Sequence, residues 1–253
     1  MKKLTLLLLI LATLPVFPGY FPDMDSLFLE ANALYQEEKY EESINKYLQI
    51  REAGFESAEL YFNTANAYFR SNKLGKARLF YERALLLNPA DEDILANLSY
   101  TESFLSDRFE IVPEMFYKRW YRSVENAYDS DTWLILSLIF FGVFLFAAAA
   151  YVFLPRLNLK KAGFYGGVLF FLLTLFSFVF SVRRYHQQSN PGTAIVMDGS
   201  VTVKSSPRES GKDLFVLHEG TKVWMENEVD QWTEIRISDG RRGWLRKISL
   251  ENI

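Results

Sequence analysis

The chain has 253 residues, of which 49% are hydrophobic and 23% charged, and its formal net charge is −3. This balance lacks the basic excess expected of a nucleic-acid binder. The chain contains no cysteine, which excludes disulfides, thiolate metal sites, cysteine nucleophiles and lipid attachment through cysteine. Its two histidines, His186 and His218, lie in different segments, so we expect isolated surface side chains and no metal site.

The N-terminus has the pattern of an export signal. Two lysines precede an apolar run over residues 4–14, and prolines and a glycine follow it. Gly19 fits the last position of a signal, whereas Phe17 is too large for the position two before it. We therefore interpret residues 1–19 as a signal peptide or an uncleaved N-terminal anchor, and both place the following residues outside the cytoplasm.

A pattern of small and bulky residues recurs after 34 positions in residues 24–107. The tripeptide Ala-Asn-Ala at 31–33 returns at 65–67, and Tyr47 returns as Tyr81. This period, with small residues where helices touch, is the signature of the tetratricopeptide repeat, a helix pair that stacks on copies of itself. We predict two repeats and a capping helix. The predicted helices cover 25–37, 40–51, 57–71, 74–87 and 91–105.

The first helix of each repeat, the A helix, lines a concave groove in this family. Spacing assigns to the groove Phe28, Asn32, Tyr35, Gln36, Phe62, Asn66, Phe69 and Arg70. An asparagine amide can donate to and accept from an extended peptide, and Asn66 is not expected to need a partner inside the protein. Ala96 and Tyr100 stand where a third repeat would supply basic residues, which argues against a carboxylate clamp. The asparagines either contact a peptide or are ordinary repeat residues without a ligand.

Residues 108–131 form a predicted juxtamembrane segment. Aromatic residues at 116, 120 and 121 are interleaved with basic residues at 118, 119 and 122. A helix of this kind either lies along a membrane surface or packs on the last repeat.

Two uncharged apolar segments, 133–154 and 162–182, are each long enough to cross a bilayer as a helix. The short linker 155–161 contains Arg156, Lys160 and Lys161 and no acid. It predicts a turn, and hence a helical hairpin whose two flanks lie on the same side of the membrane. Gly163, Gly166 and Gly167 are expected to allow close helix contact. If residues 1–19 export the chain, both flanks are periplasmic, although the count of basic residues alone equally allows the inverse topology.

In residues 193–253, short runs of alternating apolar and polar residues are separated by dipeptides typical of turns. The predicted strands cover 194–197, 201–204, 214–217, 221–226, 232–237 and 243–245, and a polar linker over 187–192 precedes them. Many short strands in so few residues predict a small barrel, which avoids exposed edges. The sequence thus predicts a multidomain membrane protein with all-α repeats, a transmembrane two-helix hairpin and a small all-β barrel.

Four segments of residues 193–253 resemble the bacterial SH3 (SH3b) domain, at 203–207, 217–223, 232–235 and 240–245. Such domains often bind peptidoglycan or peptides in the cell envelope. The resemblance implies that Trp224, Trp232 and Arg236 form a ligand surface and that Trp244 fills the barrel. A half-buried structural role is the alternative for Trp232.

The order of the parts resembles the BatE-like tetratricopeptide proteins of the Bacteroides aerotolerance (Bat) operon. The sequences NPADED at 88–93 and FEIVPE at 109–114 fit that family, and the resemblance covers the whole chain. It implies an inner-membrane protein of a Gram-negative envelope that works with Bat proteins carrying von Willebrand A domains.

We therefore expect a non-enzymatic scaffold that presents the repeats and the SH3b domain to the periplasm and assembles an envelope complex. The alternative is a cell-wall sensor that binds peptidoglycan through the SH3b domain, with the repeats as a relay. An enzyme is not expected, because no carboxylate pair in a glycosidase-like context, phosphate loop or nucleophile elbow is recognisable. No cofactor is expected, and the expected partners are proteins, the membrane and, for the sensor, peptidoglycan.

Overall fold

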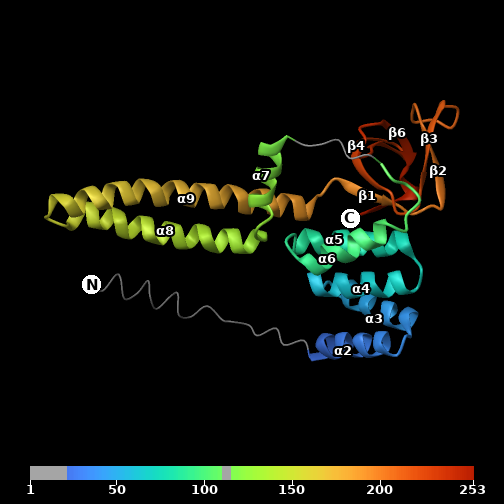
Figure 1. Ribbon diagram of the computed structural model, residues 1–253, viewed down its shortest axis with the longest axis horizontal. Coiled ribbons are helices and arrows are strands. Elements are labelled where there is room, and N and C mark those ends of the chain that lie inside the picture. The colour runs from blue at the N-terminus through green and yellow to red at the C-terminus, as the bar shows by residue number, and fades with distance from the viewer. Residues whose placement is uncertain (1–21, 110–114) are drawn as a thin grey trace.

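The computed structural model describes residues 22–109 and 115–253. Helices α2–α6 form a layered stack, α8 and α9 form a long hairpin that projects from it, and a β-sheet lies beside the stack (Figure 1). The predicted signal, residues 1–19, lies outside the described residues.

The repeat region has the five predicted helices, and their bounds are close to the expected ones. They are α2 (Pro22–Gln36), α3 (Tyr40–Glu52), α4 (Ala58–Arg70), α5 (Leu74–Leu87) and α6 (Glu92–Glu102). Glu38 and Asn72, one period apart, both adopt left-handed backbone conformations, with φ of 60° and 58°. Ala65 and Ala77 are fully buried in the core of the stack. The periodic small residues therefore lie where close packing needs them.

Side-chain caps explain where two of these helices begin. Ser57 accepts a hydrogen bond from the N–H of Leu60 at 3.0 Å. Asp91 accepts from the N–H groups of Asp93 and Ile94 at 3.1 Å each. Both caps satisfy N–H groups that have no partner inside their helix. Helix α6 then packs against α5, as expected of a capping helix.

The C-terminal region is a seven-stranded antiparallel sheet with the strand order β3-β2-β6-β5-β4-β1-β7. The strands are β1 (Thr193–Val196), β2 (Ser200–Lys204), β3 (Asp213–His218), β4 (Lys222–Val229), β5 (Trp232–Arg236), β6 (Arg242–Arg246) and β7 (Leu250–Asn252). The sequence patterns predict all of them except β7. The buried side chains of the sheet, among them Val203, Leu217 and Ile235, form a hydrophobic core of their own.

Trp244 does not fill the interior of the sheet, contrary to the prediction. It is half-buried, whereas its neighbours Gly243 and Leu245 are buried. The register explains the difference, because Gly243 pairs with the buried Ile235 while Trp244 pairs with Glu234. Successive side chains of a strand point to opposite faces, so Trp244 lies on the face opposite to the core.

The sheet packs directly against helix α5. Ile195 of β1 is fully buried within the repeat core, and Met197 and Ile253 pack against the same core. Gly220 has a φ of +84°, and a β-carbon there would stand 2.6 Å from the side chain of Leu105. A larger residue would collide at this point, so glycine permits the close approach of sheet and stack.

Helices α8 (Ser130–Phe153) and α9 (Leu157–Ser189) are long and apolar enough to cross a membrane. Gly163 approaches α8 closely, since a β-carbon there would stand 2.8 Å from the carbonyl oxygen of Ala147, and Gly167 also faces α8. The same prediction is wrong for Gly166, which faces open space. Helix α9 continues beyond the predicted end at 182, so little of the predicted linker over 187–192 remains.

The end of α9 is fixed to the repeat stack by two side chains. Arg184 Nη2 and Gln188 Nε2 both donate to the carbonyl oxygen of Leu86, at 3.0 Å each. Leu86 lies in the last turn of α5, where carbonyl groups lack partners within the helix. The hairpin and the repeats are therefore joined by hydrogen bonds as well as by the chain.

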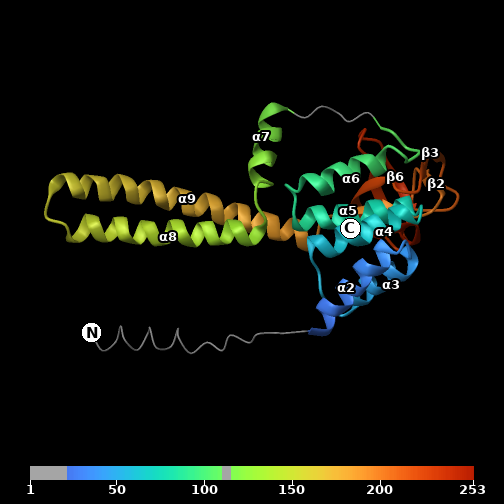
Figure 2. The same ribbon diagram turned by 60° about the horizontal axis from the view of Figure 1, so that its bottom comes forward.

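Helix α7 (Phe116–Glu125) crosses the end of the hairpin, as the two views agree (Figures 1 and 2). The ring of Tyr121 lies 5.3 Å from that of Phe180 in α9, between centroids. Trp133 Nε1 in α8 donates to the carbonyl oxygen of Glu125 at 3.1 Å. Both contacts are with the hairpin and not with the last repeat.

Candidate functional site

The two repeats carry the same tyrosine–asparagine hydrogen bond, which we call the clasp. Tyr47 Oη on α3 donates to Asn32 Oδ1 on α2 at 2.5 Å. Tyr81 Oη on α5 donates to Asn66 Oδ1 on α4 at the same distance. Each clasp joins the two helices of one repeat, and the two clasps stand one period apart.

The clasps fix which end of each amide faces the groove. Tyr47 and Tyr81 are each 1% exposed. Burial raises the pKa of Tyr47 to about 12 and also raises the pKa of Tyr81, so both hydroxyls keep their protons at neutral pH. The asparagine oxygens accept hydrogen bonds from these hydroxyls. In the part of the chain that the structure describes, neither Nδ2 group donates a hydrogen bond to the protein, so both can donate to a ligand.

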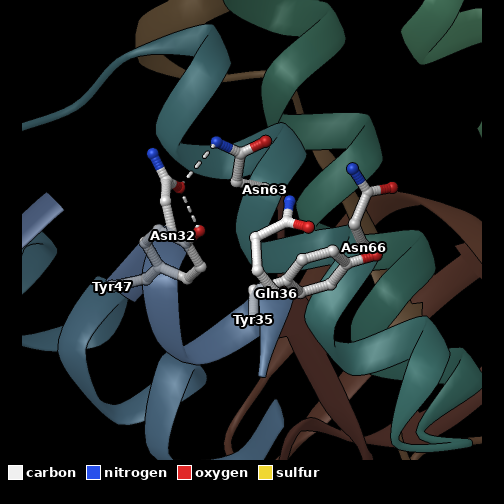
Figure 3. Close-up of a pocket in the computed structure, with 6 residues that line it drawn as sticks. All are labelled: Asn32, Tyr35, Gln36, Tyr47, Asn63 and Asn66. Atoms are coloured by element: carbon white, nitrogen blue, oxygen red, sulfur yellow. Dashed lines mark hydrogen bonds between the residues drawn. The ribbon is translucent and has the colours of Figure 1, made fainter. Parts of the chain in front are cut away.

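A pocket of about 270 Å³ opens between α2 and α4, beside the first clasp (Figure 3). It is lined by Asn32, Tyr35, Gln36, Tyr47, Asn63 and Asn66. Asn63 Nδ2 donates to Asn32 Oδ1 at 3.3 Å and so connects the two repeats. None of the lining side chains is charged at neutral pH. The pocket therefore suits an uncharged hydrogen-bonding ligand, such as a peptide backbone.

The pocket contains four of the predicted groove residues, namely Asn32, Tyr35, Gln36 and Asn66. Phe28 and Phe62 instead pack against the clasp tyrosines. Their ring centroids lie 5.8 Å from Tyr47 and 5.9 Å from Tyr81, respectively. These two phenylalanines support the site and do not line the pocket.

Phe69 and Arg70 do not line the pocket either. The Phe69 ring lies 5.6 Å from Tyr100 and 5.7 Å from Phe104, whose rings are about half exposed. The Arg70 guanidinium lies 5.3 Å from the ring of Tyr40. An aromatic surface thus extends along α4 toward the capping helix.

Sequence reasoning missed Asn63 and the partners of the asparagines. Asn63 stands where the first repeat has Leu29, so a comparison at 34 residues gives no signal for it. The expectation that Asn66 needs no internal partner is wrong, because it accepts the hydroxyl of Tyr81. The constant separation of 15 residues between asparagine and tyrosine is the signal that identifies the clasp.

On the sheet, the structure brings together two of the three predicted ligand residues. The guanidinium of Arg236 lies 4.9 Å from the Trp224 ring, and the two residues pair across β4 and β5. Trp232 shares their face but stands at the other end of β5, where Arg246 lies 5.9 Å from its ring. Trp232 is half-buried.

Charged side chains of the repeats face the sheet and are paired there. Lys222 Nζ of β4 lies 2.6 Å from Glu82 Oε2 of α5, in a pair that is mostly buried. Arg78 Nη1 donates to the carbonyl oxygen of Gly220 at 2.8 Å. Lys76 forms a further ion pair with Glu251 of β7. These contacts form the repeat–sheet interface.

Asp107 connects the segment after α6 to the sheet. It accepts hydrogen bonds from the hydroxyl of Thr221 at 2.6 Å and the N–H of His218 at 2.8 Å, and it lies 2.7 Å from His218 Nδ1. Burial alone would raise the pKa of Asp107, but these partners outweigh it and lower the pKa. The expectation of an isolated surface histidine is therefore wrong for His218, whereas His186 is exposed.

Within residues 22–109 and 115–253, no group of three His, Asp or Glu side chains is placed to hold a metal ion.

Comparison with known families agrees with the repeat geometry. Residues 58–91, which contain α4 and α5, match the family model of the tetratricopeptide repeat. The match covers the second helix pair, and the clasp and turn of the first pair repeat its geometry. This repeat typically serves as a protein–protein interaction module. Among curated proteins, none matches the chain.

Proposed function

We propose that the protein is a non-enzymatic inner-membrane scaffold that holds partner proteins through its repeat groove on the periplasmic side. The pair of clasps carries this proposal, because they keep two amide donors in an open, uncharged groove one period apart. An extended peptide presents carbonyl oxygens along its length and can accept from both donors. The resemblance to BatE-like proteins favours an envelope complex of the Bat type, with a von Willebrand A domain protein as the partner.

The groove is tested by removing the donors while keeping the clasps. A double variant, Asn32→Asp and Asn66→Asp, still accepts from the tyrosines but cannot donate, and its carboxylates repel peptide carbonyl groups. With a photo-crosslinking residue in place of Gln36, we expect partner adducts in native envelopes to fall at least about fivefold, since each of the two lost bonds contributes about 0.5–1.5 kcal/mol. Phe69→Ala should reduce them further if the aromatic surface anchors the partner.

Gln49→Glu is the matched control. It makes the same exchange of amide for carboxylate on the exposed face of α3, outside the pocket. This variant should keep the wild-type adducts. Equal adduct yields from the groove variant and the control would contradict binding in the groove.

The membrane placement rests on α8 and α9, which have the length and composition of membrane spans. A two-helix hairpin returns the chain to the side it came from, so the repeats and the sheet share one side. Because the chain has no cysteine, single cysteines report sidedness without background. Glu42→Cys and Ser210→Cys should react with an impermeant maleimide in spheroplasts, and Asn158→Cys only after lysis. The reverse pattern would contradict the periplasmic orientation.

A wall sensor acting through an SH3b-type barrel is the second candidate. The stacked Trp224 and Arg236 favour it, because both line a cavity of about 560 Å³ between the sheet and the repeats. An aromatic ring beside a cation can hold a sugar or a stem peptide. If this candidate is right, purified peptidoglycan should retain the full chain in sedimentation, Trp224→Ala should abolish retention, and Asn66→Asp should leave it unchanged.

A further inference from the structure

Helix α7 is fixed at one particular level of the hairpin. It meets α9 at Phe180 and Arg183, and it meets α8 at Trp133, in the first turn of that helix. If α8 and α9 span a bilayer, this level is the boundary between hydrocarbon and headgroups, where aromatic rings prefer to lie. Because α7 crosses the hairpin, its axis runs along the membrane surface (Figures 1 and 2).

Three large apolar side chains at the start of α7, including that of its N-cap Met115, are mostly exposed in the part of the chain that the structure describes. Phe116 is 84% exposed, Trp120 66% and Met115 64%. Such large exposed groups on a short helix are unfavourable in water and are typical of a surface that contacts another phase or partner. The contacts of α7 with the hairpin come from the other side of the helix, through Tyr121 and Glu125.

The charge of α7 is positive where it is exposed. Lys118, Arg119 and Arg122 are exposed, and the helix has one acid, Glu125. Glu125 is buried, and its carboxylate accepts from Arg183 Nε at 2.9 Å. The acid is therefore neutralised by the hairpin and does not offset the basic side chains of α7.

We propose that α7 lies in the membrane interface and binds the headgroups of anionic phospholipids through Lys118 and Arg119. The proposal rests on the membrane placement of the hairpin given above. Apolar rings enter the headgroup region while the basic groups meet lipid phosphates, which is the pattern of an interfacial amphipathic helix. Anionic lipid is the occupant that matches both the positive charge and the level of the helix beside Trp133.

The full chain in lipid nanodiscs provides the test. A spin label at Tyr117→Cys reports whether α7 contacts lipid, through its relaxation by apolar oxygen and by a water-soluble nickel chelate. We expect protection from nickel in discs containing phosphatidylglycerol and less protection in discs of phosphatidylcholine alone. Each basic group near an anionic surface contributes a factor of about five in affinity. The double variant Lys118→Gln and Arg119→Gln should therefore bind anionic lipid about 25-fold more weakly, and the same protection should need correspondingly more of it.

Two controls separate the possible failures. Arg208→Gln with Lys212→Gln removes the same charge from an exposed loop of the sheet and should leave the lipid dependence unchanged. A label at Phe146→Cys, which is 80% exposed on α8, must be protected from nickel in every disc. Exposure of this label would overturn the membrane placement itself and, with it, the proposal for α7.

Two results would overturn the proposal while the hairpin remains in the bilayer. One is free access of nickel to the label at 117 in all discs, which would place α7 in water. The other is protection that does not depend on lipid charge and persists in amphipol without lipid. That result would mean that a second copy or another protein segment covers α7.

Discussion

The concave groove and the repeat–sheet interface lie on different helices of the repeat region and differ in chemistry, since the pocket opens between α2 and α4 and the interface lies on α5. The interface is charged, and its cations meet acids or carbonyl groups, as Lys222 meets Glu82 and Arg78 meets Gly220. The pocket in the groove is lined by uncharged side chains. Tyrosine hydroxyls hold the Oδ1 atoms of its two clasp asparagines, and the Nδ2 groups are left to donate to a partner. The comparison teaches that charged side chains of α5 position the sheet. Hydrogen-bonding capacity for a partner remains on α2 and α4.

Reversing one charge of the interface should have the largest effect on stability. Lys222→Glu would place a second carboxylate against Glu82, whose side chain is 10% exposed. We expect a loss of about 3 kcal/mol in the free energy of unfolding, because a mostly buried charge loses its partner. Urea unfolding of the full chain in detergent measures it.

Lys247→Glu is the matched control for that reversal. Its partner Glu228 lies at the same distance of 2.6 Å, but both side chains are about half exposed. We expect a loss below about 1 kcal/mol. Equal losses at the two positions would show that the interface does not hold the sheet.

Within the groove, removing an amide should cost less than the charge reversal. Asn66→Ala leaves the buried hydroxyl of Tyr81 without an acceptor, which should lower the free energy of unfolding by about 1–3 kcal/mol. Asn66→Asp keeps an acceptor and should stay within about 1 kcal/mol of the wild type. If both variants unfold at the same urea concentration, the second clasp does not contribute to stability.

Acid should loosen the interface before it affects the groove. A carboxyl whose pKa is lowered by folding, such as Asp107, stabilises the fold above its unfolded pKa of about 4. That stabilisation is lost as the pH falls toward the lowered pKa. The protection of the β3 and β4 amides, measured as exchange relative to the intrinsic rate at the same pH, should therefore decrease below about pH 4. Asp107→Asn should be less stable at pH 7 and show a weaker dependence on acid; an unchanged acid dependence would exclude this carboxyl as the cause.

The smallest effect on stability is expected at Gln36. It lines the pocket, is exposed, and makes no side-chain hydrogen bond within the described part of the chain. Gln36→Ala should change the free energy of unfolding by less than about 0.5 kcal/mol. Partner crosslinking from a different groove position, such as Asn63, should nevertheless decrease. A clear loss of stability would mean that Gln36 supports the fold, as Asn66 does, and does not serve binding alone.

The sequence predicted the helices and most strands well, because local periodicity determines them. Buried small residues at a 34-residue period identify the repeats, and alternation identifies strands such as β5. Strand β7 was missed because three residues give no usable pattern. The end of α9 was missed because hydropathy marks where the apolar run ends, whereas the helix continues through polar residues to Ser189.

The candidate site was predicted only in part, because its key contacts depend on pairing between distant residues. Trp244 was predicted on the wrong face of the sheet. Which face a side chain takes depends on the register between strands, and the register pairs Trp244 with Glu234. The ion pair of Glu82 with Lys222 joins residues 140 positions apart, and no local pattern reveals it. The clasp could have been predicted from the sequence, since asparagine and tyrosine stand 15 residues apart in both repeats.

The two hydrogen bonds from α9 to Leu86 have a mechanical consequence. Helix α9 is a single rod of about 40–47 Å from the hairpin turn to these bonds, since each residue adds about 1.5 Å. If α8 and α9 span a membrane as we propose, this stiff helix fixes the height and orientation of the groove above the bilayer, whereas a flexible tether would let the groove face any direction. Partners anchored in the same membrane would then search for the groove in two dimensions at a constant height. Such confinement raises their effective concentration without any added contact.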